Sequence, residues 1–155
     1  MSNRIQSFLG SLEKAGLAPT LLRIALGAVF VAHGYAKVAL FTLPGTAQFF
    51  EAHGFPGWTA YPVFAAELFG GLSLLLGFHT RLVALGLIPI LVGALKPHLG
   101  NGWMFTNEGG GWEYVAFLIV ALATQAVLGD GAFALRTSEK RPRARGASAE
   151  LGSAG

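Results

Sequence analysis

The sequence contains no cysteine and few charged residues. Without cysteine, this chain by itself has no disulfides, thiol redox chemistry, thiolate metal sites or cysteine-ligated iron–sulfur clusters. Only 12% of the residues are charged and 53% are hydrophobic, whereas a soluble domain has about 25% charged residues. The mean hydropathy is +0.55, and the 22 glycines match the frequent use of glycine in membrane helices. The composition therefore favours an integral membrane protein.

The positively charged residues are concentrated at the C-terminal end of the sequence and beside its apolar segments. The formal net charge is +3, and most Lys and Arg residues lie in the last twenty positions or beside apolar segments. Charges placed beside apolar segments are typical of a topology signal, not of a nucleic-acid surface. We therefore expect the protein to lie in a lipid bilayer and not to bind nucleic acid.

Four apolar segments run over residues 20–41, 60–78, 82–99 and 112–129. Each is close to the ~20 residues that cross ~30 Å of hydrocarbon as a helix. They lack the alternation of polar and apolar residues that a membrane β-barrel requires. The sequence thus predicts an all-α integral membrane four-helix bundle over residues 19–135. The third segment is the weakest, because Lys96 interrupts it.

The two flanks of this domain have different characters. In residues 1–18 the positions Ile5, Phe8, Leu9 and Leu12 follow helical spacing, which predicts an amphipathic helix at the membrane interface. A cleaved signal peptide fits less well, because glycine and charged residues break the apolar run. Residues 136–155 are basic and polar, and we expect disorder there.

The Lys and Arg residues also predict the orientation. Nine of them border one end of the predicted helices, and Lys37 and Lys96 lie toward the other end. The nine are Arg4, Lys14, Arg23, Arg81, Arg136, Lys140, Arg141, Arg143 and Arg145. By the positive-inside rule, both termini are cytoplasmic and the longer loops face outward.

The first outward loop, "FTLPGTAQFFEAHGFPGW", has the pattern of a short helix. Thr46 can cap its start, Phe49 and Phe50 give it an apolar face, and Gly54 with Pro56 ends it. We expect this helix to lie at the outer interface as a cover for the bundle.

The first predicted membrane helix carries an unusual stripe. Arg23, Gly27, Phe30, Gly34 and Lys37 are spaced by four and three residues, so they fall within roughly an 80° arc of one helix. Glycines allow close approach of a neighbouring helix. This face should therefore point into the bundle, with its charged residues.

Similar stripes are predicted on the other three helices. They are Glu67–Gly71–Leu74–Phe78, Leu85–Pro89–Val92–Lys96 and Glu113–Phe117–Val120–Thr124. With a rise of ~1.5 Å per residue, the ionisable groups of all four helices reach one outer layer. Arg23 alone lies toward the inner end, where Thr124, Gln125 or the turn near Thr80 could meet it.

Two interpretations of these charges remain open. A charge inside the membrane costs about 2.5–3.5 kcal/mol on insertion scales, and such charges pair or line a cavity. Lys37 and Lys96 could form two structural ion pairs with Glu67 and Glu113. Alternatively, the groups could line an outward-open polar pocket that binds a small molecule.

The sequence resembles the DoxX family of small four-helix membrane proteins over roughly Thr20 to Leu135. The resemblance is carried by "RIALGAVFVAHGYAK", "AQFFEAHGFP", "ELFGGLSLLLGFHTR", "NEGGGWE" and "LGDGAFAL". It implies a multi-pass protein of the bacterial inner membrane. Some members are described as subunits of a thiosulfate:quinone oxidoreductase, and others are associated with redox defence or with resistance to quinones and catechols. Related folds in animals serve as chaperones or cargo receptors, so the family predicts fold better than activity.

A quinone-like ligand requires hydrogen-bond donors, a proton source and apolar walls. We take Glu67 as the candidate proton carrier. The candidate ligand-binding residues are His33, Lys37, Glu67, Lys96, His98, Trp103, Asn107 and Glu113, and the candidate structural residues are Arg23, Gly27, Phe30, Gly34 and Gly71. The wall candidates are Phe30, Tyr35, Phe64, Trp103 and Trp112, although both tryptophans also suit an interfacial belt.

Other cofactors fit the sequence poorly. A haem held by His33 and His98 is disfavoured because no paired-histidine helix pattern occurs, and His53 and His79 are expected in water-exposed loops. No zinc-binding histidine spacing and no nucleotide-binding loop are found. An oxidoreductase of this kind would depend on a redox partner subunit. The alternative is a non-enzymatic membrane protein: a small-molecule binder, a transporter or an assembly partner. Gly86 and Gly93 could support a homo-oligomer.

Overall fold

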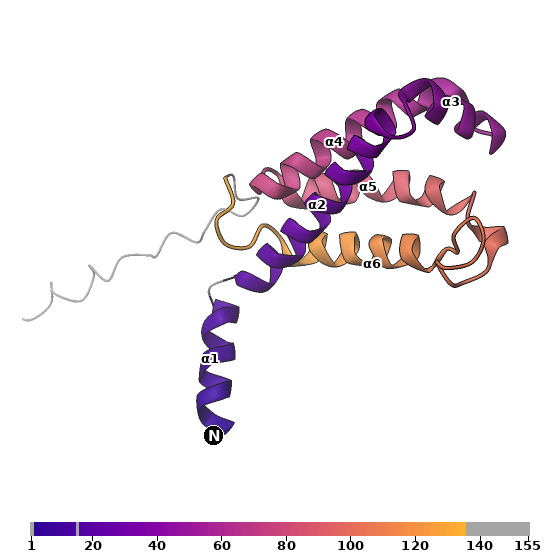
Figure 1. Ribbon diagram of the computed structural model, residues 1–155. Helices are drawn as coiled ribbons and strands as arrows, with labels where there is room; N and C mark the ends of the chain where they lie inside the picture. The colour runs from indigo at the N-terminus through magenta and orange to yellow at the C-terminus, as the bar shows by residue number, and fades with distance from the viewer. Residues whose placement is uncertain (1, 15, 136–155) are drawn as a thin grey trace, which may run out of the picture.

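A computed structural model describes residues 2–14 and 16–135 of the chain (Figure 1). Within these residues the regular elements are all helical, which confirms the all-α class. They are α1 (Ser2–Lys14), α2 (Leu17–Ala39), α3 (Leu43–Ala52), η1 (Gly57–Thr59), α4 (Ala60–Leu76), α5 (Thr80–Leu95), η2 (Leu99–Asn101) and α6 (Glu113–Leu128). The predicted disordered tail, residues 136–155, lies outside the described residues.

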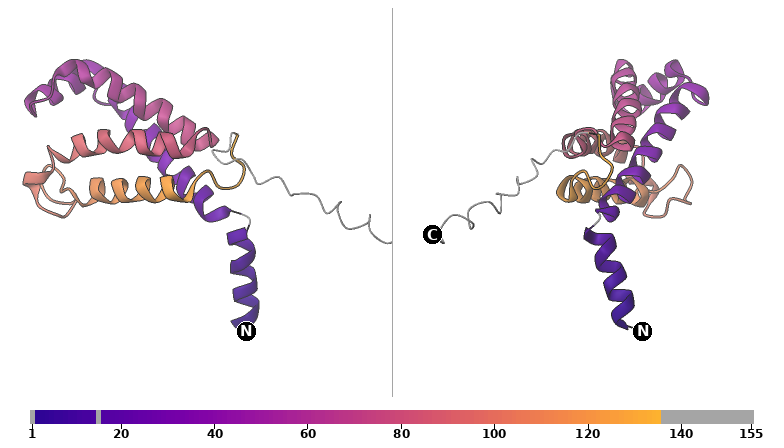
Figure 2. Two further views of the ribbon diagram at one scale, coloured as in Figure 1. Left: turned by 180° about the vertical axis from the view of Figure 1, so that it is seen from behind. Right: turned by 90° about the vertical axis from the view of Figure 1, so that its left-hand side faces the viewer.

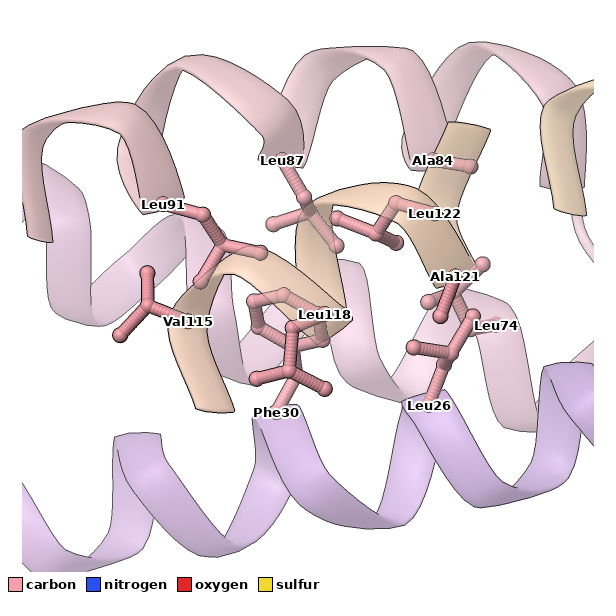
Figure 3. Packing of buried hydrophobic residues seen from close by; sticks show 10 residues of the cluster. All are labelled: Leu26, Phe30, Leu74, Ala84, Leu87, Leu91, Val115, Leu118, Ala121 and Leu122. Carbon is pink, nitrogen blue, oxygen red and sulfur yellow. The ribbon is translucent and has the colours of Figure 1, made fainter. Parts of the chain in front are cut away.

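The four long helices α2, α4, α5 and α6 form two pairs that share one core. α2 packs mainly along α4, and α5 packs mainly along α6. Side chains from all four helices meet between the pairs (Figure 3). These are Leu26, Phe30, Leu74, Ala84, Leu87, Leu91, Val115, Leu118, Ala121 and Leu122. The helices follow the predicted apolar segments, with α5 ending four residues earlier than expected.

The outer surface of this assembly is also apolar. Leu21 and Phe69 are exposed on the α2–α4 pair, and Leu85 and Phe117 are exposed on the α5–α6 pair. Exposed apolar patches of this kind mark membrane or protein contact surfaces. Two helical stretches, Leu17–Ala39 and Gly57–Leu76, are long and apolar enough to cross a membrane, whereas α5 and α6 are shorter. Four membrane crossings therefore stay a prediction.

The predicted inward stripes are correct on α2 and, except for the exposed Phe78 beyond its end, on α4, and they are wrong on α5 and α6. In α2, Arg23, Gly27, Phe30 and Gly34 are buried, and Glu67, Gly71 and Leu74 are buried in α4. In contrast, the stripes of α5 and α6 face outward, since Leu85, Val92, Phe117 and Val120 are all exposed. Lys96 and Glu113 lie at helix ends, so their polar groups can be satisfied without turning the rest of the helix inward.

The connecting segments gather at two opposite ends of this helical assembly. α3 and the loop that contains η2 lie at one end, and the α4–α5 turn and the N-terminus of α2 lie at the other (Figures 1 and 2). The α4–α5 turn is tight because Gly77 and His79 both adopt left-handed backbone conformations.

The first helix, α1, projects away from the bundle (Figure 2). Its apolar residues Ile5, Phe8 and Leu9 are exposed to the surroundings. The predicted amphipathic helix is thus present, while its place at a membrane interface stays a prediction.

The short helix α3 is present where it was expected, but it begins earlier. Thr42, not Thr46, is its N-cap, and the Thr42 hydroxyl accepts a hydrogen bond from the Gly45 N–H at 3.2 Å. Thr46 instead lies buried within the helix and donates to the Thr42 carbonyl at 2.9 Å. The expected end at Gly54 is confirmed, because this glycine has a φ of +76° just after the last turn.

Candidate functional site

A cavity of about 900 Å³ lies at the end of the bundle that carries α3. Helices α2, α3, α4, α5 and α6 all contribute to its lining. Its polar and ionisable lining residues are His33, Lys37, Thr46, His53, Thr59, Glu67, His98 and Tyr114. Its aromatic hydrocarbon walls come from Phe30, Phe41, Phe49, Phe50 and Phe55. The combination of apolar walls with a few converging polar groups is typical of a small-molecule site.

Lys37 and Glu67 form an ion pair in the wall of this cavity. The Lys37 Nζ donates a hydrogen bond of 2.6 Å to Glu67 Oε2, and the two side chains are 15% and 8% exposed. The pair joins α2 to α4 at the point where these helices approach closely, since a Cβ on Gly34 would lie 3.2 Å from the Leu68 backbone nitrogen. The first of the two expected ion pairs is therefore present.

Three histidines line the same cavity from three different parts of the chain. His33 lies on α2, His53 ends α3, and His98 precedes η2. Each uses Nδ1 to contact a backbone carbonyl oxygen: Val29 at 2.8 Å, Phe49 at 2.8 Å and Gly110 at 2.9 Å, respectively. These contacts fix the orientation of each ring.

Aromatic contacts hold two of these rings in place. The His33 ring stacks on Tyr114 of α6 with 6.2 Å between centroids. The His53 ring packs on Phe49 at 4.2 Å. The histidines are thus part of the aromatic wall. Phe49 and Phe50 of α3 line the cavity as the sequence suggested, and His53, which was not expected there, lines it as well.

Half of the predicted ligand-binding residues lie outside the cavity lining. His33, Lys37, Glu67 and His98 are brought together, whereas Lys96, Trp103, Asn107 and Glu113 are not among the lining residues. The Lys96 ammonium lies 4.7 Å from the centre of the Phe55 ring, and its cation–π contact replaces an ion pair.

The other three residues shape the loop before α6. Trp103 packs edge-on against Trp112 at 4.4 Å. Asn107 donates to the Asn101 carbonyl at 2.8 Å. Glu113 accepts a hydrogen bond from the Phe105 N–H at 2.9 Å. The expected second ion pair between Lys96 and Glu113 is therefore wrong. Lys96 contacts the Phe55 ring, and Glu113 accepts a hydrogen bond from Phe105.

Several wall residues were also misjudged from the sequence. Of the five predicted wall residues, only Phe30 lines the cavity, and Tyr35 is exposed on the surface. His53 was expected in a water-exposed loop but ends α3 beside Phe49 and lines the cavity. The spacing of Phe49 and His53, four residues apart on one helix face, was the available signal.

Arg23 lies at the opposite end of α2 and has no part in the cavity. It is only 1% exposed. Its guanidinium donates to the carbonyls of Leu74, Leu75 and Ala132 at 3.1–3.2 Å. Of the expected partners, Thr124 and Gln125 are wrong, whereas Arg23 does lie against the turn that precedes Thr80, since a Cβ on Gly77 would meet the Arg23 Nη1 atom. The chain after α6 folds back onto the start of α2 and supplies the unpredicted partner Ala132. Arg23 thus ties three segments together.

Among residues 2–14 and 16–135, no group of three or more His, Asp or Glu side chains is arranged to hold a metal ion. The three cavity histidines therefore do not converge on one metal position. The chemistry that the described site offers is hydrogen bonding, charge and aromatic contact.

The DoxX family model matches residues 18–105, which include the α2 stripe, α3, the Lys37–Glu67 pair and His98. This chain belongs to the DoxX family. It is therefore a DoxX-family membrane protein. The family match ends before α6, so Tyr114 of the cavity lies beyond it.

Two curated relatives are similar to part of the chain. "Putative oxidoreductase CatD" of Bacillus subtilis is 37% identical over 87 residues, which cover 52% of this chain and 63% of the relative. "Inner membrane protein YqjF" of Escherichia coli is 38% identical over 74 residues, covering 48% of this chain and 54% of the relative. The chain thus spans less than two thirds of either relative's length. No solved structure matches the chain.

Proposed function

We propose that this DoxX protein is the membrane subunit of an oxidoreductase and binds a quinone, or a similar small aromatic molecule, in the cavity under α3. The observation that carries this proposal is the buried Lys37–Glu67 pair in a cavity of about 900 Å³. Small-molecule sites have volumes of about 300–1,000 Å³. An aromatic ring suits the phenylalanine walls, and the polar groups can orient its oxygens.

Glu67 is the residue that would carry a proton to or from the ligand. It lies in the cavity wall and is already hydrogen-bonded to Lys37. A ligand oxygen that took the place of either partner would be held by the other one. Proton exchange would then require only a local rearrangement of one side chain.

We further propose that the protein is multi-pass in a bacterial inner membrane, with four crossing helices, cytoplasmic termini and an outward-facing cavity. Arg4 lies in α1, Arg23 near the start of α2 and Arg81 at the start of α5, whereas Lys37 lies near the end of α2 and Lys96 just after α5. The first three therefore belong to one end of the helical assembly and the two lysines to the other. This distribution supports the orientation through the positive-inside rule. The name of the E. coli relative supports the compartment.

Electrons would come from a redox partner subunit or from the substrate. The sequence has no cysteine and no nucleotide-binding loop of its own. The name of the B. subtilis relative supports an oxidoreductase role. Self-association in the bilayer through Gly86 and Gly93 of α5, where an added Cβ would meet nothing within 4 Å, would be compatible with this role.

The proposal can be tested on protein purified in mild detergent. Solvent extraction followed by chromatography should recover quinone in a fixed ratio to protein, and Lys37→Met and Glu67→Gln should each abolish it. Glu108→Gln, a change in an exposed loop, is the matched control and should retain quinone. Quinone-free protein, or quinone that is retained equally in all variants, would refute the assignment of this cavity.

A non-enzymatic role is the second candidate. The observation that favours it is that Lys37 and Glu67 satisfy each other at 2.6 Å, as a purely structural pair would. The protein would then act as a small-molecule binder, a transporter or an assembly partner. Quinone-free protein that co-purifies with a defined membrane partner would support this alternative.

A further inference from the structure

The three cavity histidines have the same tautomer. A carbonyl oxygen can only accept a hydrogen bond, so the Nδ1 atoms of His33, His53 and His98 must each carry the proton in their contacts with backbone carbonyls. In a neutral imidazole the other nitrogen is then an acceptor. Three different backbone carbonyls thus favour the same tautomer, with the proton on Nδ1, in all three rings.

The remaining nitrogen of each ring is available to a ligand. Among residues 2–14 and 16–135, no hydrogen bond involves the Nε2 atom of His33, His53 or His98, and all three residues line the cavity. Each of these three lining residues therefore keeps one ring nitrogen that can accept a hydrogen bond. The Lys37 ammonium donates one of its three N–H groups to Glu67 at 2.6 Å.

This arrangement distinguishes ligands by the protons on their oxygens. A hydroxyl group donates a hydrogen bond and matches an acceptor nitrogen. A carbonyl group only accepts, so it would face the Nε2 lone pairs without any hydrogen bond. A site that is built around acceptors disfavours a ligand that lacks the matching donor, because its polar groups then lose water without replacement.

From this geometry we propose that the cavity selects the reduced, dihydroxy form of an aromatic ligand over the oxidised dicarbonyl form, through the Nε2 acceptors of His33, His53 and His98. The inference rests on the proposed function, since it assumes an aromatic ligand in the same cavity. Beyond the proposed function, the inference specifies which redox form of the ligand is bound and which residues recognise that form.

The test compares three small ligands that share one ring. Tetramethylhydroquinone has two hydroxyls, tetramethylbenzoquinone has two carbonyls, and the dimethyl ether of the hydroquinone retains both oxygens without a proton. Binding to the full chain in lipid nanodiscs is measured by calorimetry without oxygen, with empty nanodiscs as the blank for partition into lipid. Because the protein has no cysteine, a thiol reductant can keep the hydroquinone reduced without affecting the protein.

The hydroquinone should bind at least about five-fold more tightly than the other two ligands, which is the effect of one net hydrogen bond. His53→Phe and His98→Phe should reduce this preference, because each should weaken binding of the hydroquinone more than binding of the dimethyl ether. His79→Asn is the control, because His79 does not line the cavity and Asn tolerates its left-handed backbone. It should retain the full preference.

The outcomes separate this inference from the proposed function. Equal or tighter binding of the benzoquinone, with binding lost in Lys37→Met, would overturn the selection of the reduced form and leave the cavity assignment intact. Absence of binding by all three ligands would overturn both. The comparison on the unaltered protein decides the matter even if a histidine variant fails to fold.

Discussion

Gly27 of α2 and Gly71 of α4 face each other at the closest approach of the two helices. A Cβ added to Gly27 would lie 2.8 Å from the Gly71 carbonyl oxygen, and a Cβ added to Gly71 would lie 2.8 Å from the Val31 backbone nitrogen. Both distances are shorter than real Cβ contacts, so neither helix can accept a side chain here. The crossing brings Lys37 and Glu67, farther along the same two helices, within hydrogen-bonding distance.

Gly27→Ala and Gly71→Ala should therefore destabilise the protein. Overpacking of a close-packed contact costs about 1–3 kcal/mol, which outweighs the gain of up to about 1 kcal/mol from replacing glycine in a helix. Gly86→Ala in α5 is the matched control, because its Cβ would meet nothing within 4 Å. Thermal unfolding in detergent should show lower transition temperatures for the first two variants only. Unchanged stability in both would mean that the crossing is looser than described.

The Lys37–Glu67 pair should show strong coupling in a double-mutant cycle. Lys37→Met or Glu67→Gln alone leaves a mostly buried charge without its partner, and each change should cost about 3 kcal/mol or more. The double variant should lie closer to the unaltered protein, because no charge is left unpaired.

The matched control for this cycle is the pair Lys96 and Glu113, which share no contact and interact with Phe55 and Phe105 instead. Their cycle should give additive effects within about 0.5 kcal/mol. Measured by chemical unfolding in detergent, additivity for Lys37 and Glu67 as well would contradict an energetic role for the ion pair.

How far the sequence predicted the site depends on where each residue lies along its helix. Glu67 lies well inside its apolar segment, where an unpaired charge is costly, so its inward orientation could be predicted. Arg23 lies near the start of its segment, and its inward orientation could be predicted from the stripe that it shares with Gly27 and Gly34. Lys96 and Glu113 lie at helix ends and can be satisfied by loops. Their position therefore carried no information about which helix face is buried, and the predicted stripes of α5 and α6 were wrong.

Other parts of the site depend on tertiary folding alone. His53 lines the cavity because α3 folds back over α2 and α4. Ala132 meets Arg23 because the chain after α6 returns to the start of α2. The return of the chain after α6 has no periodic signature in the sequence, so the Ala132 partner of Arg23 could not be predicted, whereas the Phe49–His53 spacing could have indicated the contact of His53 with Phe49.

Arg23 should hold the segment after α6 in place. Arg23→Met removes one donor each from the carbonyls of Leu74, Leu75 and Ala132. The Leu74 and Ala132 carbonyls keep the Gly77 N–H and the Thr20 hydroxyl as donors, so the main cost, about 1–3 kcal/mol, falls on the Leu75 carbonyl. Hydrogen exchange over residues 129–135 should become at least about ten-fold faster. Arg23→Lys should restore part of the protection, since an ammonium can still donate to one or two carbonyls. Arg4→Ala, a change on exposed α1, is the control, and equal exchange in all variants would refute the role.

The absence of cysteine makes the proposed orientation directly measurable. Glu108→Cys places a thiol in the exposed loop at the cavity end, and Ser7→Cys places one on exposed α1. If both termini are cytoplasmic, a membrane-impermeant maleimide should label the first variant in spheroplasts and the second only after lysis. The unaltered protein, which has no thiol, gives the background. The reverse pattern would turn the cavity toward the cytoplasm, and labelling of both variants in intact spheroplasts would contradict the arrangement of the two bundle ends on opposite sides of a membrane. Either result would leave the Lys37–Glu67 contact unaffected, so the measurement isolates topology from the chemistry of the site.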